Sequence, residues 1–284
     1  MEMFLCGDAE ASQAFYARNK VIIEAVTRGH DLCFELLANS QKKLDGQDRT
    51  VIWLLAASCL KEFEEIVLLC GNGFGTGAVK LMRSFYERVV TVSYLAVNTT
   101  EIQRFIDYSD IHWHKLLVEA EGIHSTFRLS PEARKHVEDN YADRKENFKQ
   151  EDCKKCGTKR LQMSWTKLDM KTMASAVNEQ LRLLLANAYL APTFHLHTTF
   201  WGIVHQSDVG PEGKLRFLGG KVQEESAQES FEQAYILLTQ LMDVLNQFFD
   251  LNQQEGIANC GQAWVRACES AWGKPVPSEV PPGD

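Results

Sequence analysis

The sequence predicts an all-α protein, a helical bundle of about seven to nine helices that carries one charged helical excursion. Apolar residues recur at helical spacing in seven segments, and almost no segment alternates strictly between apolar and polar residues as an exposed strand would. Hydrophobic residues make up 45% of the 284 residues and charged residues 24%, which is typical of a globular chain. A chain of this length can bury a sizeable core.

The first half of the chain reads as consecutive helices. Residues of roughly 10 to 44 show the helical period and indicate one long amphipathic helix or two stacked ones. The turn LDGQDRT follows, and the period resumes from Ile52 to Cys70. The stretch GNGFGTG then predicts a tight turn between helices, with Thr76 as the N-cap of the next helix.

The central helix is predicted at 75–98, GTGAVKLMRSFYERVVTVSYLAVN, and is apolar nearly all round. Such a helix is usually buried. Arg83 and Glu87 lie one turn apart on it, where neither charge is tolerated without a partner. They form either a structural ion pair or a site in which Arg83 binds an anion and Glu87 orients it or acts as a base. Tyr86 and Tyr94 either line that site or pack in the core.

The turn before this helix allows another interpretation. IVLLC, the glycine pattern Gly73-x-Gly75-x-x-Ala78, a helix and VVTVSYLAV resemble a strand–turn–helix–strand unit that binds a dinucleotide. A short glycine motif is a weak signal without that context. Because residues 66–70 continue a helical period and no further strand–helix alternation follows, two helices joined by a turn are the preferred interpretation.

The later segments are also helical, apart from one excursion at 130–170. Residues 102–120 keep the period, and Ser130-Pro131-Glu132 starts a highly charged helix. The stretch 153–171 holds six Lys or Arg against one Asp and predicts a basic loop, so residues 1–255 form one domain with this excursion. Further segments are expected as a helix from 173 that breaks near Pro192, a helix at 194–206, a small hairpin in DVGPEGKLRFLGG, a helix at 231–252, and a short helix with a flexible proline-rich tail at 256–284.

Histidines and cysteines are the candidate metal ligands of this chain. His197 and His205 lie about 12 Å apart along the predicted helix, too far to share a metal. His205 is a candidate acid, base or anion donor, and the alternative is a hydrogen-bonded structural histidine. Cys153-Lys-Lys-Cys156 has the spacing of half a zinc site, but no second pair completes it. The sequence therefore predicts neither metal nor cofactor.

Composition also bears on location and partners. The N-terminus lacks the features of a signal peptide, no stretch is long and apolar enough for a membrane span, and the eight cysteines are interpreted as reduced, so we expect a cytoplasmic protein. A net charge of −8 argues against non-specific coating of nucleic acid, although the basic loop could touch RNA phosphates. The apolar stripe of the N-terminal helix, with Trp264 and Trp272, predicts a homodimer.

Three stretches, AVKLMRSFYERVVTVSYL, EIQRFIDYSDIHWHKL and YLAPTFHLHTTFWGIVHQS, resemble the bacterial family catalogued as domain of unknown function 5677, over roughly residues 50–250. The resemblance implies Arg83, Glu87 and His205 as site residues. That family is similar, more distantly, to the all-helical HEPN proteins, several of which are ribonucleases with an Arg-x4–6-His motif. Here the residues before His205 are TFWG, so Arg83 would have to supply the cation from another helix.

Two functions follow from these residues. The first is a binding or regulatory module whose buried Arg83, Glu87 and His205, flanked by Tyr86, Tyr94 and His197, recognise a small anionic ligand, a nucleotide or a partner. The alternative is an RNA-directed phosphodiester hydrolase in which His205 acts as acid or base and Arg83 stabilises transition-state charge.

Overall fold

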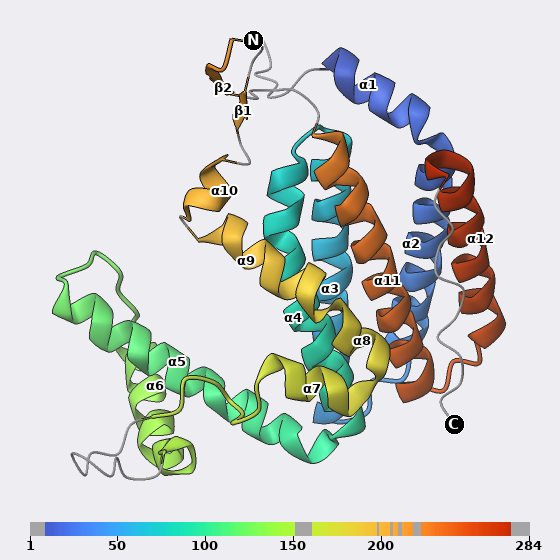
Figure 1. Cartoon of the computed structure of the whole chain (residues 1–284). Coiled ribbons are helices and arrows are strands. Elements are labelled where there is room, and N and C mark those ends of the chain that lie inside the picture. Colours follow the sequence, from blue (N-terminus) through green and yellow to red (C-terminus); the bar gives the residue numbers. More distant parts are fainter. Residues whose placement is uncertain are drawn as a thin grey trace, which may run out of the picture. The chain divides into compact units, whose positions relative to one another are not determined.

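The computed structural model describes residues 9–150, 161–197, 199–204, 207–209, 212–217 and 223–273. These residues are overwhelmingly helical, which confirms the all-α class (Figure 1). The long helices are α1 (Ala9–Arg18), α2 (Lys20–Gln41), α3 (Gln47–Gly71), α4 (Gly75–Val97), α5 (Ile102–Gly122), α6 (Pro131–Arg144), α11 (Glu224–Phe248) and α12 (Gln254–Trp272). Four shorter α-helices between 170 and 204 raise the number among the described residues above the seven to nine expected.

The chain falls into two compact units. One comprises Met1–Val97 with Met173–Asp284, and the other comprises Asn98–Thr172. We predicted a single domain over 1–255 with an excursion at 130–170. The second unit already begins at Asn98, because α5 packs against α6.

The core of the first unit lies between α3, α4 and α11, which contact one another. On its other side α11 meets α2 and α12, so the five helices run alongside one another (Figure 1). The apolar stripes predicted for these helices face inward, since each buries its side chains at helical spacing. Fully buried members include Ile22, Ile52, Ile66, Phe85, Val89, Leu238 and Leu241.

The turn between α3 and α4 packs closely against the start of α11. Gly73 has a φ of 84°, and a Cβ atom on Gly75 would lie 2.7 Å from the carbonyl oxygen of Gln223. The Gln223 side chain accepts hydrogen bonds from the Thr76 backbone N–H and hydroxyl, both at 2.7 Å. Thr76 is therefore not the N-cap we predicted, since it lies inside α4. Helices on both sides of the glycines rule out the dinucleotide-binding unit.

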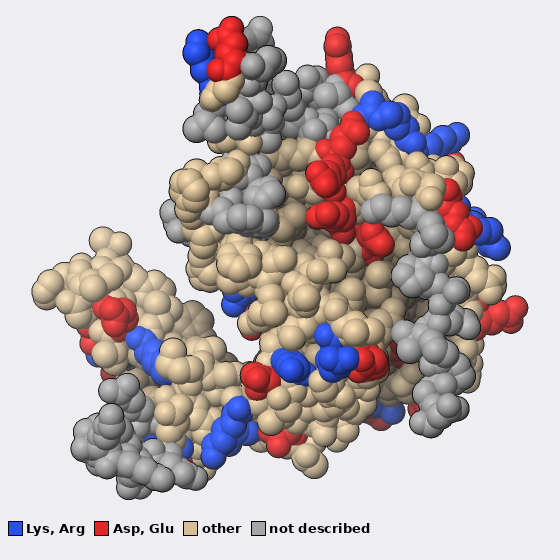
Figure 2. Space-filling model, viewed as in Figure 1, with Lys and Arg blue, Asp and Glu red and all other residues tan. Residues whose placement is uncertain are grey.

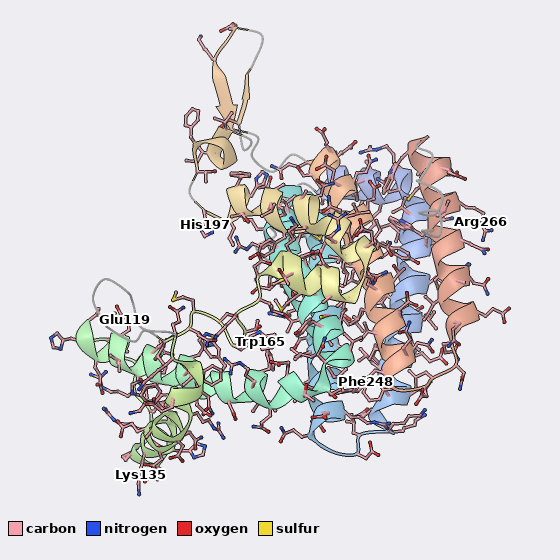
Figure 3. The ribbon with its side chains drawn as sticks, turned by 60° about the horizontal axis from the view of Figure 1, so that its bottom comes forward. Glu119, Lys135, Trp165, His197, Phe248 and Arg266 are labelled. Carbon is pink, nitrogen blue, oxygen red and sulfur yellow. The ribbon has the colours of Figure 1, made fainter. Side chains whose placement is uncertain are left out.

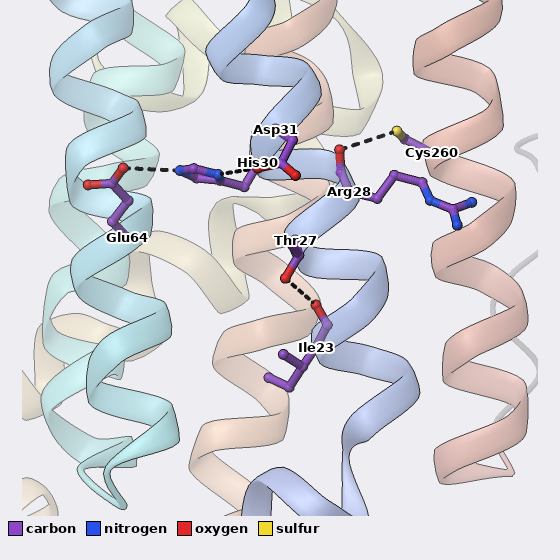
Figure 4. A network of polar contacts seen from close by, with 7 residues as sticks. All are labelled: Ile23, Thr27, Arg28, His30, Asp31, Glu64 and Cys260. Atoms are coloured by element: carbon purple, nitrogen blue, oxygen red, sulfur yellow. Dashed lines mark hydrogen bonds and ion pairs between the residues drawn. The ribbon is translucent and has the colours of Figure 1, made fainter.

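The N-terminal segment forms two helices, α1 and α2, and α2 is held between α3 and α12. His30 on α2 lies 3.1 Å from a carboxylate oxygen of Glu64 on α3, while the Cys260 thiol of α12 donates to the Arg28 carbonyl at 3.8 Å (Figure 4). The α12 helix, expected only as a short one, spans 19 residues. Its proline-rich continuation lies outside the described residues.

Much of the apolar surface from which we predicted a homodimer makes contacts within the first unit. The apolar stripe of α2 packs against α11 and α12. Trp264 stacks on Tyr235 with ring centroids 4.2 Å apart, and the Trp272 indole N–H donates to the Asn19 side chain at 3.2 Å. These contacts stabilise the first unit, and the homodimer stays a prediction.

The segment after 169 is divided into short helices: α7 (Met170–Val177), α8 (Glu179–Leu184), the π-helix η3 (Leu185–Leu190), α9 (Ala191–Leu196) and α10 (Phe200–Val204). We predicted a break near Pro192 and one helix at 194–206. Instead Pro192 lies in the first turn of α9, where its missing N–H costs little, directly after the wider π-helical turn. The break falls at His197, whose backbone is extended.

The predicted hairpin is present. Strands β1 (Ser207–Val209) and β2 (Leu215–Phe217) pair antiparallel, with Asp208 opposite Arg216. Within the described residues no helix is long and apolar enough to cross a membrane.

The second unit is built on α5 and α6. Ser130 caps α6 as predicted, since its hydroxyl accepts the Ala133 backbone N–H at 3.2 Å and Pro131 follows at the first helical position. The α6 helix ends at Arg144, and the short 3-10 helix η2 (Lys145–Phe148) follows. Arg104 of α5 donates to the carbonyl oxygens of Trp165 and Asn147 and to the Gln162 side chain, at 2.7, 3.1 and 2.9 Å.

Candidate functional site

Arg83 joins α4 to the π-helical segment. Its two terminal nitrogens donate to the Thr193 hydroxyl at 2.7 Å and to the Tyr189 hydroxyl at 3.3 Å. The guanidinium carbon also lies 4.6 Å from the centre of the Tyr189 ring, a cation–π geometry. All of these partners are neutral. Arg83 is therefore solvated by protein dipoles, and no carboxylate within the described residues pairs with it.

Glu87 is exposed and forms no ion pair with Arg83. The buried ion pair predicted on α4 is thus absent, because Arg83 turns toward η3 and α9 while Glu87 faces outward. The buried acid of this region is Glu62 of α3, whose side chain lies 3.3 Å from a guanidinium nitrogen of Arg88, without hydrogen-bond alignment. Burial raises the pKa of Glu62, and Ser84 and Arg88 oppose that rise.

Sequence reasoning missed Glu62, although its position carried a signal. It lies three residues after Cys59 and four before Ile66, both of which are fully buried on α3. An acid on such a core stripe requires a partner. Arg88, one residue after the acid we had singled out, supplies it.

Tyr86 and Tyr94, which we predicted either to line the site or to pack in the core, are buried side chains of α4. The Tyr86 hydroxyl donates to the Leu181 carbonyl at 2.7 Å, its ring lies 5.8 Å from that of Tyr189, and burial raises its pKa to about 12. Tyr94 is only 8% exposed. Neither lines the groove described below, so the structure gives both a packing role and adds nothing to a ligand-binding one.

The predicted histidines are not brought together. His197 is exposed at the C-terminal end of α9, where Figure 3 labels it. His205 lies outside the described residues, and so do Cys153 and Cys156. The structure therefore gives no geometry for the triad of Arg83, Glu87 and His205.

A groove of about 580 Å³ lies between α4, the segment from α8 to α9, and α11. Its size lies in the range of small-ligand sites. One wall is apolar, with Val79 and Met82 from α4. A second comes from the π-helix and α9. The third is one face of α11. The lining residues from the second and third walls are Leu184, Asn187, Ala191, Pro192, His195, Glu225, Ser226, Glu229, Ser230, Glu232, Gln233 and Ile236.

Arg83 and the groove share a wall. Thr193 and Tyr189, which Arg83 holds, alternate along the chain with groove residues Asn187, Ala191 and His195. π-helical turns are rare and frequently occur at functional sites. Arg83 therefore holds the segment that forms one side of the groove.

The charge of the groove is negative. Glu225, Glu229 and Glu232 line it, whereas none of the described lining residues is Lys or Arg. Figure 2 shows acidic side chains gathered along the face over α11. In the sequence this glutamate-rich stretch is typical of a solvated helix face. It becomes one wall of a groove only because α4 and the segment from α8 to α9 pack beside it.

The described cysteines and acids do not gather into a metal centre. Among the described residues no group of three or more His, Cys, Asp or Glu is placed to hold a metal ion. Cys33, Cys59, Cys70, Cys260 and Cys268 are buried. Burial raises the pKa of the Cys33, Cys59 and Cys70 thiols and keeps them protonated.

The fold and the groove define a predominantly helical protein with a carboxylate-rich cleft. The chain belongs to the family of unknown function DUF5677, which matches residues 49–213, more than half of its length. Comparisons with curated proteins and with solved structures gave no significant match. The match includes Arg83 and the π-helix but ends before α11, so the acidic wall lies outside it.

Proposed function

We propose that this protein is a binding or regulatory module, and that the groove between α4, α8 to α9 and α11 is its ligand site. The observation that carries the proposal is the groove itself: a concavity of about 580 Å³ with one apolar wall and one ionisable wall. Apolar lining with a few convergent polar groups is the usual composition of a small-ligand pocket.

The expected anionic ligand or nucleotide does not suit this groove. An anion would meet three glutamates, while the guanidinium of Arg83 points to Tyr189 and Thr193. Repulsion between a bound anion and these carboxylates would cost free energy. An anion site at Arg83, Glu87 and His205 stays a prediction, and so do the RNA-directed hydrolase, the homo-oligomer and the cytoplasmic location.

The test is a thermal-shift screen of charged and neutral metabolites against three forms of the full chain. Asn187→Trp fills the groove, and Leu183→Trp places the same ring on the exposed face of the same segment. A ligand at a hundred times its Kd should stabilise the wild type by about 2.7 kcal/mol. We expect Leu183→Trp to keep this shift and Asn187→Trp to lose it.

Two results would contradict the proposal. If no compound shifts the wild type, or if Asn187→Trp responds as the wild type does, the groove is not the site. The hydrolase is tested in parallel with single-stranded RNA. Cleavage by the wild type that disappears in His205→Ala, with the helical content retained, would replace the binding module with an enzyme.

A further inference from the structure

We infer that the ligand of this groove is an extended organic cation with several N–H donors, a linear polyamine. The inference rests on the proposed function, because it assigns a ligand class to the site proposed there. It uses three properties of the groove: the spacing of its carboxylates, its unsatisfied polar atoms, and the absence of a compact metal site among the described residues.

The carboxylates follow one face of α11. Glu225, Glu229 and Glu232 are separated by four and three residues, which corresponds to about 6 and 4.5 Å along a helix axis. Glu225 and Glu229 are exposed at the rim, Glu232 is half-buried, and Glu225 and Glu232 make no ion pair within the described part of the chain. A row of negative charges with this spacing complements amines separated by three or four methylene groups.

Two uncharged groups on the same wall point to a hydrogen-bonding ligand. The side-chain oxygen of Gln233 is buried and has no hydrogen-bond partner among the described residues. The Ser230 hydroxyl, in a residue only 2% exposed, has only the Cys70 thiol, a weak hydrogen-bonding group, as its partner in the described part of the chain. A buried carbonyl acceptor without a hydrogen bond costs free energy, and an N–H donor of a ligand in the groove would remove this cost by forming the bond.

A compact cation fits less well. The groove glutamates do not belong to any cluster that could hold a metal ion among the described residues. Divalent cations need several oxygen ligands within about 2.6 Å. The apolar wall formed by Val79 and Met82 would instead cover the methylene groups of a polyamine.

Isothermal titration of the full chain with spermidine tests the inference. Glu225→Gln, Glu229→Gln and Glu232→Gln combined should weaken binding by about tenfold to a hundredfold, since each partly exposed ion pair contributes up to about 1 kcal/mol. The matched control changes three exposed acids elsewhere in the first unit, Glu10, Glu35 and Glu269, to Gln, and should bind as the wild type does.

A second variant leaves the charge unaltered. Gln233→Met removes the unpaired acceptor, so the ligand-free protein should keep its stability while spermidine binding weakens about fivefold. Equal losses in the groove triple variant and in the control triple variant would reduce the interaction to non-specific charge attraction and overturn the inference. Binding of Mg²⁺ or of a lysine-rich peptide in the groove, with no binding of spermidine, would also overturn it.

The two proposals fail in different ways. If spermidine does not bind but a neutral or anionic compound stabilises the wild type and not Asn187→Trp, the groove remains a ligand site and only its assignment to polyamines is wrong. If no compound stabilises the wild type more than it stabilises Asn187→Trp, both proposals are wrong.

Discussion

Arg83 illustrates how a charged side chain is accommodated in a helix interface without an opposite charge. Its guanidinium bonds two hydroxyls and lies against a tyrosine ring, and all three groups come from η3 and α9. The sequence predicted correctly that Arg83 needs partners, because the surrounding helix is apolar. It could not predict which partners, because Tyr189 and Thr193 are more than a hundred residues away in the chain.

A double-mutant cycle on Arg83 and Glu87 tests this assignment. Arg83→Ala should lower the free energy of unfolding by about 1–2 kcal/mol through the lost hydrogen bonds and ring contact. Glu87→Gln should change it by less than about 0.5 kcal/mol, because Glu87 is exposed. Since the two side chains do not touch, their coupling measured by urea unfolding should be near zero. A coupling above about 1 kcal/mol would restore the ion pair that the sequence suggested.

His30 is the one histidine bridged by two carboxylates among the described residues. Burial alone would lower its pKa, but hydrogen bonds to Glu64 and Asp31 raise it, and the pKa ends above the ordinary value of 6.5. A histidine whose pKa is raised on folding stabilises the protein most when it is protonated.

The stabilising contribution of His30 is therefore complete below pH 6.5 and is lost as the pH rises through the raised pKa. We expect the wild type to exceed His30→Gln in stability by less than about 1 kcal/mol at pH 5.5, because the pair is partly exposed. The difference should shrink toward pH 8.5 in thermal melts. A difference that grows with pH would show that His30 acts in its neutral form. His136→Gln, on an exposed face of α6, is the control.

At the scale of elements, long periodic helices were predictable and interruptions were not. The segments α2, α3, α4, α5 and α11 follow the apolar period because each buries one stripe. Pro192 suggested a helix end, yet the π-helical turn before it leads into a helix whose first turn holds the proline. Such a turn depends on tertiary contacts, including those of Tyr189 and Thr193, and has no pattern in the local sequence.

Glycine substitutions at the start of α4 test the close packing of α4 against α11. An Ala at position 75 would place its Cβ 2.7 Å from the Gln223 carbonyl oxygen and 2.9 Å from the Ala227 nitrogen, both backbone atoms that cannot rotate away. We expect Gly75→Ala to cost about 1–3 kcal/mol in urea unfolding.

Gly77→Ala is the matched control, two residues later in the same helix. Its Cβ would lie 3.6 Å from the nearest Leu69 side-chain atom, an ordinary contact. Replacing a helical glycine by alanine should then stabilise by about 0.5–1 kcal/mol. We expect the free energy of unfolding to fall in Gly75→Ala and to rise in Gly77→Ala. A loss of stability in both variants would mean that close packing at position 75 is not what distinguishes the two glycines.

At the scale of the whole molecule, composition and period predicted an all-helical protein, and the basic stretch after Ser130 predicted that part of the chain leaves the main bundle. The division at Asn98 could not be predicted this way, since α5 has the same apolar period as the core helices. The groove was equally hidden, because its three walls come from segments far apart in the sequence and each wall looks ordinary alone.

Arg104 is the centre of a group of polar contacts within the second unit. It bonds the carbonyl oxygens of Trp165 and Asn147 and the Gln162 side chain, and its guanidinium lies 4.6 Å from the Phe148 ring centre. Arg104→Ala leaves these acceptors without their donor, which should destabilise the unit by roughly 3 kcal/mol. Because residues 98–172 form their own compact unit, the loss should be local.

Hydrogen exchange of the full chain, followed by mass spectrometry, separates this outcome from a global one. In Arg104→Ala we expect peptides from α5 and α6 to exchange faster by about two orders of magnitude, while peptides from α3, α4 and α11 keep their wild-type protection. Lys135→Ala, which removes an exposed cation from α6, should change neither set. If the protection of α4 and α11 falls together with that of α5, the two units unfold as one cooperative structure, and the division at Asn98 and Thr172 has no energetic counterpart.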